Sequence, residues 1–252
     1  MILPISDYPN PRGAPWMTIA LIAANVLVYV LVTLPLSAQR PAPNDPLFHE
    51  YLRAIAQALP PGVSIRDIAQ LTSVYDLVVF EFGFRPAAIG VVTLFTSMFL
   101  HGGLLHLAGN MLFLWIYGDN VEHRLGALPF LVWYLLAGIA ATAFQTLFNL
   151  GSQIPLIGAS GAISGVLGFY FVWFPHYMVR VLVFLFPFFM GTINVPARIV
   201  LGIYLVLDNV LPFLFASGMA GIAHGAHIGG FIAGLAAAWI MRGRPPPTPV
   251  RY

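Results

Sequence analysis

The sequence places one serine and four histidines within stretches that are otherwise apolar. Ser160 lies in the run Gly-Ala-Ser-Gly at 158–161, and His227 lies in the run Ala-His-Ile-Gly-Gly at 226–230. A serine hydroxyl is a weak nucleophile until a base takes its proton, and an imidazole is suited to that task at neutral pH. Polar groups inside apolar segments are costly, so we expect them to serve a function. A Ser160–His227 pair would have the chemistry of a hydrolase.

Hydrolysis of an amide also needs hydrogen-bond donors directed at the negative oxygen that develops. His106 and Asn110 are four residues apart, about 40° around a helix, and therefore project from the same face. Together with the backbone N–H of Ser160, they could supply these donors. Asp208 is the only acid well inside an apolar stretch, and nothing in the sequence places it beside His227. A Ser-His dyad is therefore the simplest prediction.

Four other polar residues and one charged run have structural interpretations. We expect His101 and His224 to organise helix ends or cavity water, and Asp208 and Asn209 to make interface or water contacts. The Glu-His-Arg run at 122–124 is expected to provide an ion pair or a helix cap.

Glycines recur four residues apart in the two segments that hold the predicted nucleophile and base. The pairs Gly161–Gly165 and Gly230–Gly234 are small-xxx-small patterns, which allow two helix backbones to approach closely within a membrane. Packing through these glycines would bring Ser160 and His227 within hydrogen-bonding distance.

The composition indicates a membrane protein. The 252 residues are 59% hydrophobic and only 8% charged, whereas a soluble domain has about a quarter charged residues. So little charge cannot cover a water-facing surface, which argues against a soluble enzyme, a disordered chain and a coiled coil. The net charge of +2 and the lack of any basic run argue against a nucleic-acid partner. Cysteine is absent, so disulfides and thiolate chemistry are excluded.

Six apolar runs are long enough to cross a bilayer, which takes about 20 residues of helix. We therefore predict an all-α polytopic membrane protein, with residues 1–252 in a single membrane domain that ends in a flexible tail at 243–252. The predicted spans are 16–36, 102–119, 127–148, 159–176, 196–214 and 222–241.

Two segments outside the predicted spans differ from each other. Residues 37–92 carry charges of both signs and several prolines, which predicts an aqueous or membrane-surface insert with a short amphipathic helix near 47–59. Residues 180–195 are apolar but interrupted by proline and glycine. This pattern predicts an interfacial loop, although a seventh span remains possible. The Phe-rich run at 184–189 is expected to face lipid.

The placement of arginine predicts the orientation of the chain. Six spans put both termini on one side of the membrane, and the positive-inside rule makes that side cytoplasmic and the 37–92 insert external. The arginines expected on the cytoplasmic side are Arg12, Arg124, Arg180, Arg198, Arg242, Arg244 and Arg251.

Several separated blocks resemble the rhomboid intramembrane serine proteases. Residues 99–110 match the family's His-x4-His-x3-Asn pattern, 158–161 match its Gly-x-Ser-Gly motif, and 226–230 match its Ala-His-x-x-Gly motif. The run 122–126 resembles the charged turn that follows the family's second span. These blocks occur in the family's order between about 93 and 240, and the three catalytic motifs lie on three different spans, which makes the resemblance specific.

The resemblance implies a six-helix rhomboid-like bundle around a water-filled cavity open to the outside. It implies that Ser160 is the nucleophile and His227 the general base, and that His106 and Asn110 line the oxyanion hole. A transmembrane substrate would enter laterally near the fifth span and the loop before the sixth. The residues implied in support of the site are His101, Gly158 and Gly161.

The implied partners are transmembrane protein substrates and the lipid bilayer, with no cofactor and no metal. We expect the protein in a bacterial cytoplasmic membrane, and we leave its oligomeric state open. Two positions depart from the family pattern. Val92-Thr93 stand where many members carry a Trp-Arg pair. Ser164 stands where some members place an aromatic residue against the catalytic imidazole. Both departures concern loop geometry and the shape of the substrate site.

Three alternative functions are weighed against proteolysis. A rhomboid-like protein that binds transmembrane clients without cleaving them would keep the fold, but that class typically lacks the serine or the histidine. A zinc or haem site on the four histidines would leave the 158–161 run and Asn110 unexplained. A transporter is the weakest alternative, because no inverted repeat is visible.

Overall fold

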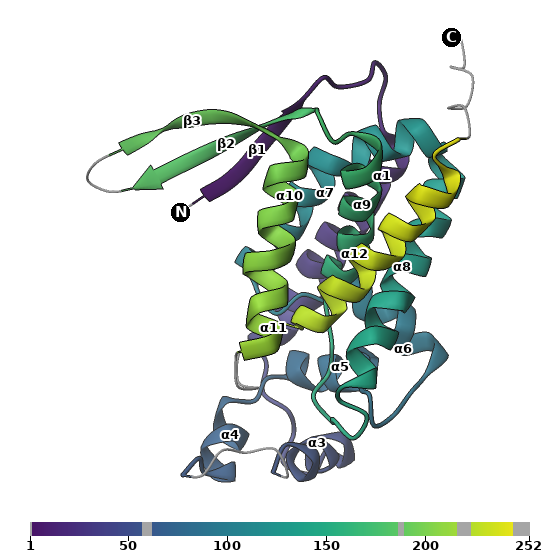
Figure 1. The fold of residues 1–252 in the computed structure, drawn as a ribbon. Coiled ribbons are helices and arrows are strands. Elements are labelled where there is room, and N and C mark those ends of the chain that lie inside the picture. Colours follow the sequence, from purple (N-terminus) through teal and green to yellow (C-terminus); the bar gives the residue numbers. More distant parts are fainter. Residues whose placement is uncertain (1, 57–61, 186–188, 216–222, 244–252) are drawn as a thin grey trace.

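Six helical segments form the body of the protein (Figure 1), one at each predicted span. The structure, a computed structural model, describes residues 2–56, 62–185, 189–215 and 223–243. The predicted helical membrane bundle is confirmed, while nearly all of the predicted tail lies outside the described residues. The segments are α1 with η1 and α2 (Trp16–Val28, Tyr29–Thr33 and Leu34–Ser37), α7 (Leu104–Leu125), α8 (Ala127–Leu147), α9 (Ser160–Trp173), α10 with η3 and α11 (Ala197–Leu205, Val206–Val210 and Leu211–Phe215) and α12 (His224–Met241).

The segments differ in length. Four are long and apolar enough to cross a bilayer: α1 to α2, α8, α10 to α11, and α12. α7 reaches this length with α6 (Val91–Thr96) and η2 (Ser97–Phe99), which meet it at a bend of 92°. α9 has only 14 residues, and every residue from Gly161 to Tyr170 is buried. The bundle is therefore built around a short helix enclosed by its neighbours.

A β-sheet replaces the interfacial loop predicted for residues 180–195. Strands β2 (Met178–Leu185) and β3 (Phe189–Pro196) form an antiparallel hairpin, and β1 (Ile2–Tyr8) pairs with the other edge of β2. We call β1, β2 and β3 the lateral sheet. The prediction was wrong because valine-rich alternation favours strands, and because proline is tolerated at a strand end. Part of the predicted lipid-facing Phe run, 186–188, lies outside the described residues.

The 37–92 insert lies at the opposite end of the bundle from the lateral sheet (Figure 1). Its helices are α3 (Pro46–Ala56), α4 (Ile65–Leu71) and α5 (Val74–Phe82), and α3 confirms the predicted amphipathic helix. Tyr75 of α5 accepts from the backbone N–H of His101 (3.0 Å) and donates to its carbonyl (2.9 Å). Phe84 pairs with Leu156 through two backbone hydrogen bonds. The insert therefore supports both the turn before α7 and the loop before α9.

The closest contact between helices joins α9 to α12, as the glycine spacing predicts. A Cβ atom added to Gly230 would lie 2.0 Å from the carbonyl oxygen of Gly161, and one added to Gly234 would lie 1.9 Å from that of Gly165. Backbone atoms cannot move aside as a flexible side chain can. Only glycine at 230 and 234 therefore permits this approach, which confirms the small-xxx-small prediction for the α12 pair. The α9 pair instead permits close packing on α8, because a Cβ at Gly161 or Gly165 would lie 2.6 or 2.2 Å from that of Ala141 or Ala137.

Glu122 ties the end of α7 to the start of α1. Its carboxylate accepts from the backbone N–H groups of Met17 (2.9 Å) and Thr18 (2.7 Å), donors that the first turn of a helix leaves unpaired. The cap predicted for this run is confirmed, but α7 extends to Leu125, so these residues belong to the helix and not to a turn after it. Arg124 packs over the Trp173 ring, 4.4 Å from its centroid, and forms no ion pair with Glu122 among the described residues.

A buried carboxylate attaches the lateral sheet to the bundle. Asp7 of β1 is 8% exposed and accepts hydrogen bonds from the hydroxyl of Tyr170 in α9 (2.5 Å) and the amide of Asn120 in α7 (2.8 Å). Burial raises the pKa of Asp7, an effect that outweighs the hydrogen bonds that favour the charged form.

The α9–α12 contact predicts a strong effect of one methyl group. Gly234→Ala should destabilise the protein by about 1–3 kcal/mol, because the added carbon overlaps a backbone carbonyl that cannot yield. Gly109→Ala in α7 is the matched control, since its Cβ would meet nothing within 4 Å. Thermal unfolding in detergent checks both variants, and equal melting temperatures for the two would contradict the packing argument.

The raised pKa of Asp7 predicts a pH-dependent stability. Folding favours the protonated carboxyl, so this contribution is complete below the ordinary carboxyl pKa and is lost as the pH rises through the raised value. The apparent melting temperature of the wild type should therefore fall over that range. Asp7→Asn, which keeps an acceptor oxygen but does not ionise, should flatten the dependence. An identical slope in the variant would assign the pH effect to another group.

Candidate active site

Ser160, the predicted nucleophile, is the first residue of α9 and follows a tight backbone turn. Gly158 has a φ of +113°, a conformation that favours glycine, and its N–H donates to the carbonyl of Ser97 at 2.8 Å. The first N–H groups of a helix have no partner within it, so the amide of Ser160 is free of the helical ladder. Glycine at 158 is thus required by the turn that presents Ser160.

Ser160 and His227 lie within hydrogen-bonding distance, across the close contact between α9 and α12. The hydroxyl oxygen of Ser160 is 2.7 Å from Nε2 of His227, and both residues are half-buried. The two residues come from helices whose backbones meet through the paired glycines. A hydroxyl held against an imidazole nitrogen in this way can transfer its proton to that nitrogen.

Asn209 is in direct contact with the same imidazole, contrary to the predicted interface or water contact. Its side-chain oxygen lies 2.6 Å from Nδ1 of His227, while its side-chain nitrogen donates to the carbonyl of Tyr204 at 2.8 Å. Asn209 is only 1% exposed. Because the amide oxygen can only accept, Nδ1 must carry the proton, which leaves Nε2 free to accept from Ser160.

The position of Asn209 depends on a local irregularity. Residues 206–210 form a single π-helical turn, η3, within the α10 to α11 segment, and such turns often occur at functional sites. The sequence did show that Asn209 is an amide within an apolar run. Plotting the segment as a regular α-helix did not predict that this amide contacts His227. Neighbouring Asp208 has an exposed side chain.

An aromatic residue from α10 lies near the imidazole, although Ser164 occupies the position where some family members have one. Ser164 is fully buried, and its hydroxyl lies 3.1 Å from the hydroxyl of Tyr204. The Tyr204 ring centroid lies 6.3 Å from that of His227. Sequence reasoning missed Tyr204, which reaches the site from a different helix.

His106 and Asn110 border the turn that presents Ser160. The position of a Cβ on Gly158 would lie 2.8 Å from Nε2 of His106 and 3.9 Å from the side-chain nitrogen of Asn110. His106 is exposed, whereas Asn110 is 7% exposed and donates to the carbonyl of His106 at 2.9 Å. Both predicted donors therefore lie beside the turn that presents Ser160.

The two remaining histidines have different environments. His101 is fully buried, and its ring meets that of His106 edge to face, with the centroids 5.0 Å apart. His224 is the first residue of α12, and its Nδ1 is buried without a partner in the described part of the chain. Among the described residues, no three His, Asp or Glu side chains come together as metal ligands would.

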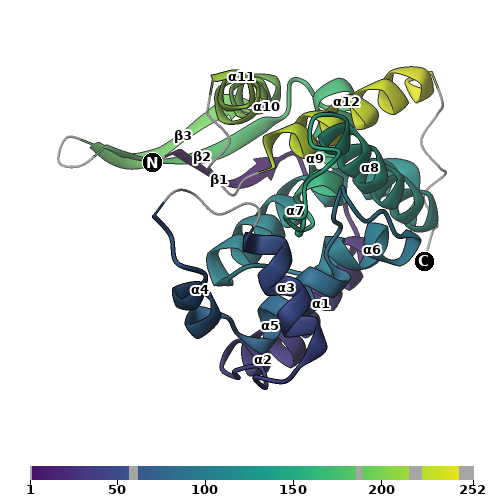
Figure 2. The same ribbon diagram turned by 90° about the horizontal axis from the view of Figure 1, so that it is seen from below.

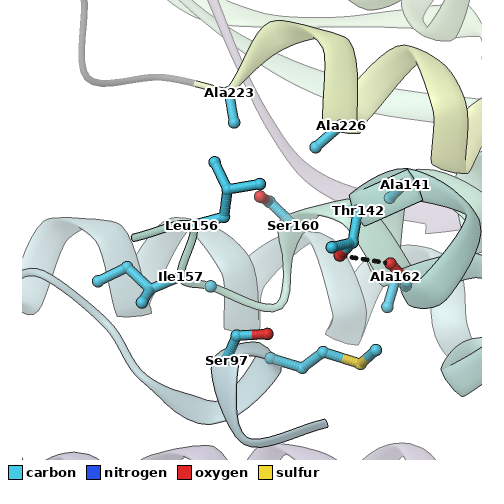
Figure 3. Close-up of a pocket in the computed structure, with 13 residues that line it drawn as sticks. Ser97, Ala141, Thr142, Leu156, Ile157, Ser160, Ala162, Ala223 and Ala226 are labelled. Carbon is cyan, nitrogen blue, oxygen red and sulfur yellow. Dashed lines mark hydrogen bonds between the residues drawn. The ribbon is translucent and has the colours of Figure 1, made fainter. Parts of the chain in front are cut away.

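A small cavity opens next to Ser160. Figure 3 shows the Ser160 hydroxyl beside Leu156, with Ala226 of α12 and Ala223, the residue before α12, across from them. Seven of the thirteen residues that line the cavity are glycine or alanine, and Thr142, which donates to the carbonyl of Gly138 at 2.9 Å, adds a polar wall. These walls leave space for a small side chain beside the hydroxyl.

Comparison with known proteins identifies relatives of the chain. The family model of the rhomboid domain matches residues 89–244. The chain is 34% identical over 145 residues to rhomboid protease GluP of Bacillus subtilis, an alignment that covers 58% of this chain and 25% of that protein. It is 38% identical over 100 residues to the mitochondrial rhomboid protein 1 of Saccharomyces cerevisiae, covering 38% and 28% of the two chains.

A longer alignment extends into the N-terminal region. The chain is 27% identical over 243 residues to RHOMBOID-like protein 4 of Arabidopsis thaliana, covering 92% of this chain and 54% of that protein. The chain thus spans between about a quarter and about half of the length of these curated relatives. The family model covers more than half of this chain and includes every helix that contributes to the site, so the chain belongs to the rhomboid family of integral membrane proteins.

Proposed function

We propose that this protein is an intramembrane serine endopeptidase that hydrolyses peptide bonds in the transmembrane segments of other membrane proteins. The observation that carries the proposal is the 2.7 Å contact between the Ser160 hydroxyl and Nε2 of His227. Ser160 is the first residue of α9, so no earlier turn of the helix offers a carbonyl to its hydroxyl. The hydroxyl lies instead against the group best suited to remove its proton.

The proposed reaction uses Ser160 and His227 in two steps. Nε2 of His227 takes the hydroxyl proton as the oxygen of Ser160 attacks the substrate carbonyl, and the imidazolium then protonates the leaving amine. Water next attacks the acyl-enzyme as His227 takes one of its protons. The imidazolium then returns that proton to the Ser160 oxygen as the bond to the new carboxyl group breaks. Asn209 accepts from Nδ1–H throughout, which holds the ring in the tautomer that both steps require.

The developing oxyanion would be stabilised on the Gly158 side of Ser160. His106, Asn110 and the backbone N–H of Ser160 would be its donors, since both side chains border the Gly158 turn and all three match the family motif. A preorganised donor of this kind contributes about 3 kcal/mol to the transition state. His101 supports the site by packing against His106, and Gly158 by permitting the turn. Gly161 supports it by letting α9 lie close to α8, since a Cβ there would be 2.6 Å from that of Ala141.

The substrate class follows from the position of the site. Ser160 is at the end of α9 that is nearer the insert, within a helix enclosed by the bundle. We place the insert on the external side of the membrane and both termini in the cytoplasm. A transmembrane segment entering beside α10 and α12 would have to unwind there, which small and helix-breaking residues favour. The cavity next to Ser160 suits a small side chain before the cleaved bond. The similarity to a Bacillus subtilis rhomboid protease supports a bacterial cytoplasmic membrane.

Loss of either reacting group should abolish activity without loss of fold. Wild-type protein in detergent should react with a fluorophosphonate probe, which labels activated serines, whereas Ser160→Ala and His227→Ala should remain unlabelled. Each variant should also lose nearly all cleavage of a transmembrane substrate in vesicles. Thermal unfolding of the same samples checks the fold. If folded wild type failed to react both in detergent and in bilayers, the protein would instead be a client-binding member of the family without catalysis.

The contact of Asn209 with His227 predicts a separate kinetic effect. Asn209→Ala should lower kcat on the order of 10²-fold with KM little changed, because the imidazole loses the acceptor that orients it. Asn209→Asp restores an acceptor and should recover much of the rate. Asp208→Asn, at the exposed neighbouring position, is the control and should retain full activity. Equal losses for the alanine and aspartate variants would show that position 209 acts only through packing.

A further inference from the structure

The lateral sheet projects sideways from the bundle. Figure 1 shows β2 and β3 running across the helix axes at the end of the bundle where α10 begins, and Figure 2 shows them passing beyond α10, clear of the other helices. Val179 and Val181 of β2 are buried. The outer part of the hairpin has no helix of the described chain beyond it in either view.

The exposed surface of the lateral sheet is largely apolar and carries a sparse positive charge. Met190 is 75% exposed on the face of β3 that also holds Thr192 and Asn194, whereas Ile193 is exposed on the opposite face. Ile5 of β1 also has an exposed side chain. Arg180 is the only charged residue between 178 and 196, and the next is the exposed Arg198 at the start of α10. Large apolar side chains next to isolated arginines are typical of protein segments at a membrane interface.

The lateral sheet also lies at the right level for such an interface. β3 ends at Pro196, and the spanning segment α10 to α11 begins at the next residue, Ala197. On the lipid side of that segment Ile199 and Ile203 are exposed. The apolar surface of α10 is therefore continuous with that of the hairpin, at the depth where the helix enters the bilayer.

We propose that the lateral sheet lies in the boundary between headgroups and acyl chains of the bilayer that the bundle crosses. The exposed apolar side chains contact acyl chains, and Arg180 and Arg198 contact anionic headgroups. The occupant of this surface is thus the lipid of the protein's own membrane. Pairing of a second copy along the free edge of β3 is the competing occupant.

The same geometry connects lipid to the proposed active site. Because β3 continues without a break into α10, the position of the hairpin sets that of the helix that carries Tyr204 and, one π-helical turn on, Asn209. These two residues contact Ser164 and His227, respectively. Displacing the hairpin from the interface should therefore impair the orientation of the imidazole. This second half of the proposal rests on the proposed function, whereas the first half does not.

The absence of cysteine from the chain makes a direct test of depth possible. Met190→Cys would carry a nitroxide spin label in vesicles of phosphatidylethanolamine and phosphatidylglycerol, and its collisions with oxygen and with a water-soluble nickel complex would be measured. Ile203→Cys on α10 gives the lipid reference, and Asp67→Cys on the exposed surface of the insert gives the aqueous reference. The expected depth for Met190 lies between the two.

Two results would overturn the interfacial position. A label at Met190 as accessible to nickel as the one at Asp67 would place the hairpin in water. Dipolar broadening between labels at Met190, at low protein density in the vesicles, would show that a second copy covers β3. Neither result bears on proteolysis, so this measurement is independent of the proposed function.

The coupling is tested by activity in two environments. Met190→Asp should cleave a transmembrane substrate on the order of tenfold more slowly than wild type in the same vesicles, while the two should be equal in detergent. Met190→Leu, which keeps an apolar side chain, is the control and should match wild type in both. An unchanged rate for Met190→Asp in vesicles would overturn the coupling, and fluorophosphonate labelling of Ser160 would still report whether the dyad is active.

Discussion

The structure depends on one backbone contact, that between α9 and α12. Lipid offers no hydrophobic force to drive helices together, so a tight interface must come from close packing. The carbonyl groups of Gly161 and Gly165 lie where any side chain at Gly230 or Gly234 would have to be. This approach holds the Ser160 hydroxyl 2.7 Å from the His227 imidazole. The geometry of the site therefore depends on the absence of side chains at Gly230 and Gly234 as well as on the side chains of Ser160 and His227.

Around that contact, several polar groups inside the bundle take a partner from another element. His227 lies between a serine of α9 and an asparagine of η3, and Tyr75 of the insert holds both backbone groups of His101. Glu122 of α7 accepts from the backbone at the start of α1, and Asp7 at the end of β1 accepts from Asn120 of α7. Unpaired polar groups are expensive away from water, so these pairings fix the register of neighbouring segments while satisfying hydrogen bonds.

The sequence was sufficient for the helices and for the pairing of Ser160 with His227, because apolar length and glycine spacing are local patterns with a single membrane-compatible solution. It did not predict the contact between Asn209 and His227. A π-helical turn changes which side chains face inward, and the spacing of apolar residues does not reveal such a turn. The lateral sheet was missed for a different reason. β1 and β2 are separated by about 170 residues of chain, and an apolar run alone does not distinguish a strand from an interfacial loop.

The shortness of α9 sets the depth at which Ser160 sits. Fourteen residues rise about 21 Å, whereas the hydrocarbon core of a bilayer is about 30 Å thick. A helix that ends near the lateral sheet therefore begins well below the opposite surface. Under the proposed function, lipids with longer acyl chains would bury Ser160 further from bulk water and lengthen the part of a substrate that must unwind to reach it. Hydrophobic thickness would then determine which peptide bonds the site can meet.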